Sequence, residues 1–194
     1  MIIVLGRPSV ADGPTGPVPA GLACAVAIAA AALASPVELV GSVGDDAAGD
    51  AVAIGLARAG VGHAALLRIS AVATPRSGTA DALTRLDAAD VELGLRYLSD
   101  MRVVVIADAL PDGVAAVVAE AAAYAGAAVV VLVTRGALPP SGFGASATVL
   151  EAPEDAQAPF AIAVARYAAA LGAGTDPELA LRQAVEAAGW EPVA

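Results

Sequence analysis

The feature that most constrains the fold is a glycine- and aspartate-rich segment at residues 41–50, with the sequence GSVGDDAAGD. An apolar run precedes it, and a pattern with apolar residues every three or four positions follows it and stops at a further glycine. Asp45 or Asp46 is placed to accept hydrogen bonds from the first turn of a helix, and Gly41 and Gly44 are expected to adopt backbone angles that a side chain would penalise. The segment therefore predicts a buried strand, a tight corner and a capped helix.

The rest of the chain alternates strand patterns with helix patterns. Strands are predicted at residues 1–5, 37–40, 64–69, 102–107, 129–133 and 147–150. Helices are predicted at residues 20–33, 46–59, 88–98, 111–125 and 153–171, and from 177 onward. The alternation predicts a three-layer α/β/α fold with a mostly parallel sheet, in one domain that spans residues 1–194. The most β-prone run, residues 129–133, is expected to be a central strand.

Two stretches lack this pattern. Residues 7–19 are predicted to be a loop, because they contain many residues that break helices or central strands. These residues are Pro8, Gly13, Pro14, Gly16, Pro17 and Pro19. Residues 70–84 are too irregular to assign beyond a possible edge strand and turn.

The chain is apolar enough that a membrane has to be considered, with 58% hydrophobic residues and a mean hydropathy of +0.75. The longest apolar run, residues 22–34, is mostly alanine and is shorter than the ~20 residues that span a bilayer, so no transmembrane helix is expected. The run ends in Ala-Leu-Ala-Ser, which imitates a signal-peptide cleavage site. The acidic Asp12 upstream and the strand-like residues 1–5 argue against a secretory leader.

Charge and cysteine content exclude other classes. Ten Lys and Arg against 20 Asp and Glu give a net charge of −10, and no basic cluster interrupts that balance, so nucleic acid and anionic membranes are not expected partners. The single cysteine, Cys24, excludes an internal disulfide and fits a reducing, cytoplasmic location. With His63 as the only histidine, no metal cluster or Ser/His/Asp set can be assembled.

The glycine- and aspartate-rich segment, continued by Leu56-x-x-x-Gly60-Val61, resembles the segment that follows the sugar-binding helix in the ribokinase or PfkB carbohydrate-kinase family. The alternative is a generic strand-to-helix corner of another α/β protein. The resemblance implies a ribokinase-like fold and an ATP-dependent phosphotransferase with an alcohol acceptor, which would use ATP and Mg²⁺ if active. The chain is shorter than typical members, and residues 70–84 leave little room for the β lid that covers the sugar.

The resemblance also implies binding residues. Asp12 is similar to the family's early sugar-binding aspartate, and Gly21 stands where members carry a Gly-Gly-x-x-x-Asn group that holds sugar hydroxyls, although the asparagine position falls on Ala25. Thr134 and Gly136 resemble a Thr-x-Gly-x-x-Gly turn near the nucleotide, whose second glycine is replaced here by proline. The expected ligand is therefore a sugar or nucleoside.

The catalytic position departs from the family. Active members carry Gly-Ala-Gly-Asp before a long helix, where the glycine N–H groups hold the transferring phosphate and the aspartate accepts a proton. Residues 155–160 read Asp-Ala-Gln-Ala-Pro-Phe, so the aspartate position falls on Ala158 and no catalytic residue is assigned. We expect a binding or scaffold protein without phosphotransferase activity. The alternatives are a kinase with a minimal site that uses Asp12 and Asp155, and a structural subunit that forms homo-oligomers through helices 20–33 and 153–171.

Overall fold

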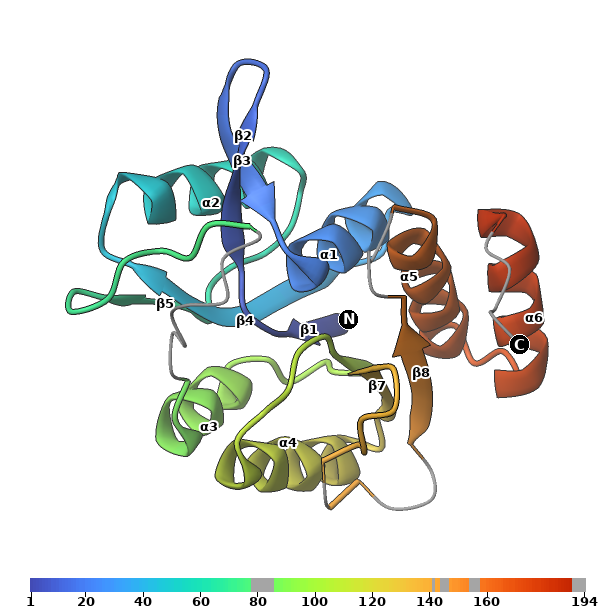
Figure 1. Ribbon diagram of the computed structural model, residues 1–194. Helices are drawn as coiled ribbons and strands as arrows, with labels where there is room; N and C mark the ends of the chain where they lie inside the picture. Colours follow the sequence, from blue (N-terminus) through green and yellow to red (C-terminus); the bar gives the residue numbers. More distant parts are fainter. Residues whose placement is uncertain (78–85, 141, 144–146, 154–157, 190–194) are drawn as a thin grey trace.

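The computed structural model describes residues 1–77, 86–140, 142–143, 147–153 and 158–189. Its centre is a six-stranded sheet with the order β5-β4-β1-β6-β7-β8, in which every pairing is parallel (Figure 1). The strands are β1 (Ile2–Leu5), β4 (Val37–Gly44), β5 (Leu66–Ile69), β6 (Val103–Ile106), β7 (Ala128–Thr134) and β8 (Thr148–Ala152). The predicted parallel sheet is thus confirmed.

Helices cover both faces of the sheet. One layer contains α1 (Leu22–Ala32), α2 (Ala47–Arg58), α5 (Ala158–Gly172) and α6 (Pro177–Ala188), and the other contains α3 (Ala88–Arg96) and α4 (Asp112–Ala125). Successive strand residues point to opposite faces, so in β1 Ile2 and Val4 enter the first core while Ile3 and Leu5 enter the second. Because both faces are buried, the strands are apolar throughout, and the predicted three-layer arrangement is confirmed.

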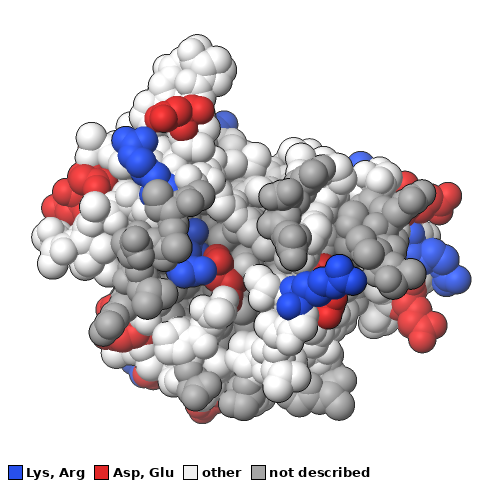
Figure 2. All heavy atoms as spheres, in the orientation of Figure 1, with Lys and Arg blue, Asp and Glu red and all other residues white. Residues whose placement is uncertain are grey.

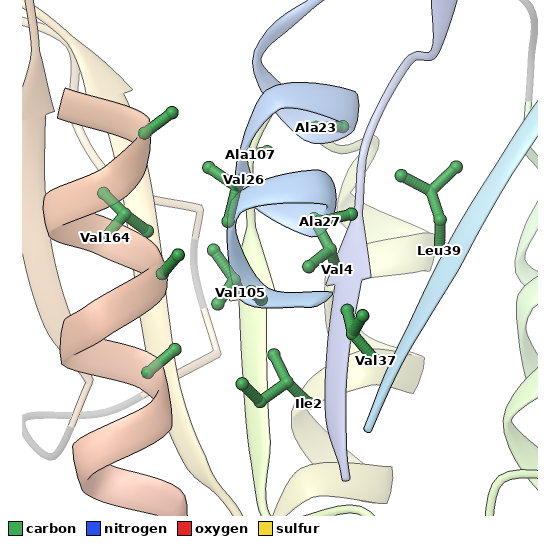
Figure 3. Close-up of a cluster of buried hydrophobic side chains, with 14 of the residues drawn as sticks. Ile2, Val4, Ala23, Val26, Ala27, Val37, Leu39, Val105, Ala107 and Val164 are labelled. Atoms are coloured by element: carbon green, nitrogen blue, oxygen red, sulfur yellow. The ribbon is translucent and has the colours of Figure 1, made fainter. Parts of the chain in front are cut away.

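Small side chains let the helices of the first layer lie close to the sheet. Ala23, Ala27 and Ala30 of α1 are fully buried, and α5 contributes Val164 to the same core. Figure 3 shows Ala23 and Ala27 of α1 beside the strands, with Val26 directed toward α5. The predicted interface helices α1 and α5 therefore contact each other within one chain (Figure 1).

The predicted loop at residues 7–19 is wrong. It forms an antiparallel hairpin of β2 (Ser9–Gly13) and β3 (Gly16–Ala20), which projects from the body of the molecule (Figure 1). Pro17 and Pro19 are tolerated because β3 is an edge strand, and the two prolines share the same side of it, opposite Asp12 and Val10. The prolines and glycines that predicted a loop therefore belong to a short hairpin with edge strands.

Helix α5 is described from Ala158, Pro153 is not helical, and the predicted helix residues 154–157 lie outside the described part of the chain. Strand β7 has a parallel neighbour on each side, so the prediction of a central strand is confirmed. Predicted caps are confirmed at Asp87 and Asp176, whose carboxylates accept N–H groups of the first turns of α3 and α6.

The glycine- and aspartate-rich corner is held by one carboxylate. Asp46 caps α2 by accepting the Gly49 N–H at 2.7 Å, and it also accepts the backbone N–H of Thr74 at 2.9 Å and its hydroxyl at 2.7 Å. The buried Thr74 hydroxyl in turn accepts the Gly44 N–H at 2.9 Å. The corner therefore ties the end of β4 and the start of α2 to the segment that follows β5.

The glycines of this corner serve close approach. Gly41 and Gly44 do not have positive φ, so the expectation of unusual backbone angles is wrong. A Cβ at Gly44 would collide with the carbonyl oxygen of Val72, and one at Gly49 would collide with the carbonyl oxygen of Gly44. Glycine is required because the backbones pass too near each other for any side chain.

Gly49→Ala should lower the free energy of unfolding by about 1–3 kcal/mol, because backbone must move to admit the methyl group. Gly113→Ala is the matched control: its Cβ would lie 3.8 Å from the nearest atom, and α4 should gain up to about 1 kcal/mol. Urea unfolding followed by circular dichroism measures both. Equal midpoints for the two variants would contradict the close-approach explanation.

Asp46→Asn should destabilise the protein by about 1 kcal/mol at pH 7, because the charge-assisted bonds to Thr74 and Gly49 weaken. Those bonds hold the pKa of Asp46 below its usual value, so its contribution is present above the unfolded-state pKa and is lost as pH falls through the lower folded-state pKa. The difference between wild type and variant, measured by urea unfolding at several pH values, should therefore shrink in acid. Asp87→Asn, where the carboxylate holds one N–H group of α3, should cost less.

Candidate functional site

The strand order changes direction between β1 and β6. From β1 the chain crosses through α1 to β4 on one side, and from β5 it returns through α3 to β6 on the other side. In open parallel sheets the space beyond the carboxyl ends of two such strands is the usual place for a ligand. The residues that follow these ends are Gly6 and Arg7 after β1, and Ala107 and Asp108 after β6.

Asp108 and Arg7 form an ion pair at this switch point. The Arg7 backbone N–H donates to Asp108 Oδ2 at 2.8 Å, and Arg7 Nη2 lies 3.3 Å from Oδ1. Only 19% of the Asp108 side chain is exposed, against 45% for Arg7. Burial raises the pKa of Asp108 above its usual value, and the bonds and charge of Arg7 partly oppose that rise.

Gly6 makes room for this carboxylate. A Cβ at Gly6 would lie 2.6 Å from Asp108 Oδ2 and 2.6 Å from the Cβ of Ala23 on α1. No side chain fits in that space, so glycine after β1 lets the carboxylate reach the backbone N–H of Arg7. Gly6 therefore shapes this site by allowing two segments to approach closely, as Gly44 does at the corner between β4 and α2.

A cavity of about 360 Å³ opens beside the pair. Its lining residues come from the carboxyl ends of β1, β6, β7 and β8 and from the first turn of α1. The polar members are Arg7, Asp108 and Thr134, and the walls are mainly Leu22, Leu110, Leu138, Pro140 and Pro153. A small, mostly apolar cavity with a few convergent polar groups is the usual form of a small-molecule site.

A larger and more open hollow of about 690 Å³ lies at the opposite, amino end of the sheet. It is bordered by the last residues of α4 and α5 and by the exposed Asp100 and Arg102. Its lining includes no buried ionisable side chain, and it lies at the wrong edge for a ligand of a parallel sheet. The smaller cavity is therefore the candidate site, although the other hollow is larger.

No family model matches this sequence, and no curated protein matches it. Solved structures, in contrast, superpose well on this chain. Ribokinase of Arabidopsis thaliana, complexed with ribose and ATP, superposes with a TM-score of 0.70 at 17% identity, over 96% of this chain and 90% of that one. The chain has a ribokinase-like fold.

Other solved structures superpose in the same way on this ribokinase-like chain. A putative ribokinase II of E. coli, in complex with ATP and Mg²⁺, has a TM-score of 0.67 at 15% identity, covering 94% of this chain and 89% of that one. A putative phosphofructokinase of Staphylococcus aureus has a TM-score of 0.67 at 14% identity, covering 98% and 92%. The predicted fold is thus confirmed at sequence identities that show fold alone.

The ribokinase-like fold brings some of the predicted site residues to the cavity. Thr134, at the end of β7, lines it, whereas Gly136 lies beyond that strand with φ +76° and is not among the lining residues. Gly21 precedes α1 with φ +89°, directly before the lining residue Leu22. A nucleotide role for Thr134 and Gly136 and a sugar role for Gly21 remain predictions.

Asp12 lies elsewhere. It is on the projecting hairpin, its side chain is 89% exposed, and its carboxylate pairs with Arg76 at 3.3 Å. It is not among the residues that line the cavity. Its role as a sugar ligand stays a prediction that would require the hairpin to approach the cavity.

Ala158 stands at the position where the sequence predicts the family's aspartate, and this assignment remains a prediction. In the described part of α5, Ala158 comes first and is exposed, and no acidic residue lies in the first turn. Pro159 comes next and has no N–H to donate. Asp155, the acid of the alternative hypothesis, lies outside the described residues.

Sequence analysis missed Arg7 and Asp108. Both are charged residues that come within two positions of the end of a buried apolar strand, and parallel strands end at the same edge. The sequence shows a charged residue shortly after each of these strands, but only the sheet order shows that β1 and β6 are neighbours. Without that order, each charge is indistinguishable from an ordinary loop residue.

The part of the chain that the structure describes contains no group of three His, Cys, Asp or Glu residues that could hold a metal ion, and none of its helices is long and apolar enough to cross a membrane. Burial raises the pKa of the Cys24 thiol to about 12, so it is an inert core residue. Figure 2 shows one face on which basic side chains lie in separate small groups.

Asp108→Asn should raise the melting temperature at pH 7. Because the folded-state pKa is raised, the stabilising contribution of Asp108 is present below the unfolded-state pKa and is lost as pH rises through the folded-state pKa. Asparagine keeps an acceptor for the Arg7 N–H without the charge, so the gain should vanish by about pH 3. Scanning calorimetry across pH measures this. Asp12→Asn, an exposed carboxylate paired with Arg76, should show no gain.

Proposed function

We propose that this protein binds a small hydroxyl-bearing molecule, a sugar or nucleoside, in the cavity beside Asp108 and does not transfer phosphate. The proposal is supported by residues 158 and 159: by the predicted register the family's aspartate position falls on the exposed Ala158, and the exposed Pro159 that follows has no N–H for a phosphate. Ribokinase-like proteins in complex with ribose, ATP and Mg²⁺ support the fold and the kind of ligand.

Phosphate transfer depends on two features that Ala158 and Pro159, among the described residues of this helix, do not offer. A transferring phosphate is held by free N–H groups at a helix N-terminus, and Pro159 removes one of them. The acceptor hydroxyl needs a base, and alanine supplies none. General-base catalysis is typically worth about 10²–10⁴ in rate, and removal of one oxyanion donor costs about 10²–10³ more.

Asp108 suits a hydroxyl ligand. An ionised carboxylate only accepts hydrogen bonds and has about four lone-pair positions, of which the Arg7 donors occupy two. A ligand hydroxyl that donated to the remaining positions would offset the burial of this charge. The surrounding leucine and proline walls would contact the apolar face of a sugar ring or nucleobase.

A kinase with a minimal site is the second candidate. It is favoured by Asp108 itself, because a buried acid with a raised pKa in a cavity is a common form of catalytic base. In this candidate Asp108 would take the proton of the acceptor hydroxyl, and ATP with Mg²⁺ would occupy the side of the cavity near Thr134.

Calorimetric titration with ribose, other sugars, nucleosides, ATP and ADP, beside a coupled assay of ADP release, separates the candidates. We expect binding of at least one sugar or nucleoside, and ADP release no faster than without protein. Asp108→Asn should weaken binding about 10- to 100-fold through loss of a bond to a charged group. Turnover that Asp108→Asn abolishes would replace the proposal with the kinase candidate, and absence of any binding would refute both.

A further inference from the structure

Strand β8 is the last strand of the sheet and pairs with β7 along one side. Among the described residues, none pairs with its outer side. An unpaired strand edge presents a row of N–H and C=O groups that can bond to another strand. Edges are usually protected by lysine, proline or a bulge, and the five residues of β8, Thr148–Ala152, contain neither lysine nor proline.

The two faces of β8 differ. Thr148 and Leu150 point toward α5, where the Thr148 hydroxyl lies 2.8 Å from the Tyr167 hydroxyl and Leu150 joins the first core. Val149 and Glu151 point to the other face. There the layer formed by α3 and α4 leaves Val149 42% exposed and Glu151 exposed. With respect to the described residues, β8 is therefore unpaired along its outer edge and exposed on one face.

We infer that β8 is the interface of a homodimer, in which two copies pair their β8 strands antiparallel across a two-fold axis at Leu150. This register uses the whole strand, because Leu150 is its middle residue. It places Leu150 against its own copy, and Thr148 against the partner's Ala152, on the face toward α5.

The same register also satisfies the charges. On the open face it sets Val149 opposite the partner's Glu151, so the two Glu151 carboxylates are offset by two residues along the strands and do not face each other directly. A register shifted to centre on Glu151 would place two like charges directly opposite each other, which is destabilising. Glu151 is the one charged residue of β8, so the strand carries little of the net charge of −10 that would separate two copies.

A second copy is the occupant that this edge fits best. A short, nearly uncharged strand that is self-complementary when reversed needs no other partner to complete its hydrogen bonds. The dimer would join two six-stranded sheets into one continuous sheet. It would leave the cavity at Asp108 accessible, since the edge of β8 lies outside the residues that line it, apart from Ala152.

Light scattering coupled to size exclusion, with the full-length chain at several concentrations, tests the inference. The wild type should be a dimer, and Val149→Asp should be a monomer because the introduced carboxylate would face the partner's Glu151. Adding Glu151→Lys to Val149→Asp should restore the dimer through opposite charges in the same register. Leu93→Asp, which changes a 55% exposed residue on α3, should leave the dimer intact.

Circular dichroism and melting temperature should show that each variant folds, since Val149, Glu151 and Leu93 are all exposed to solvent. A monomeric wild type at high concentration would overturn the inference. So would a dimer that survives Val149→Asp, a double variant that stays monomeric, or loss of the dimer in Leu93→Asp.

Discussion

Burial of a parallel sheet on both faces is the constraint on which the rest of this structure depends. Every strand residue of β1 and β6 is buried, so both faces of the sheet must be covered by helices. Because the strands are parallel, the chain must return from the carboxyl end to the amino end of the sheet between one strand and the next. Alanine-rich helices meet this demand by lying close to the sheet, as α1 does with its fully buried alanines.

The same constraint creates the site. Parallel strands all end on one side of the sheet, and where the crossovers change direction no helix of the described residues fills the space between the ends of β1 and β6. The chain places there a carboxylate that is mostly buried and a partly exposed arginine. Burial raises the pKa of Asp108 and therefore works against folding at neutral pH.

Glycine acts by close approach at both decisive points of the chain. At Gly44 and Gly49 it admits the Thr74 segment to the Asp46 carboxylate, and at Gly6 it admits Asp108 to the Arg7 N–H. None of these three has positive φ. Sequence patterns suggest turns at such glycines, whereas contacts between segments far apart in the chain explain them here.

The sequence by itself determined the alternation of strands and helices, the parallel sheet and the caps at Asp46, Asp87 and Asp176, because these follow from local periodicity and short-range hydrogen bonds. It also predicts that the family's aspartate position falls on Ala158. Only the tertiary structure decided that prolines occupy an edge strand and that Arg7 and Asp108 meet beside a cavity. Those outcomes depend on which strands become neighbours, and residues about one hundred positions apart carry no local sign of their contact.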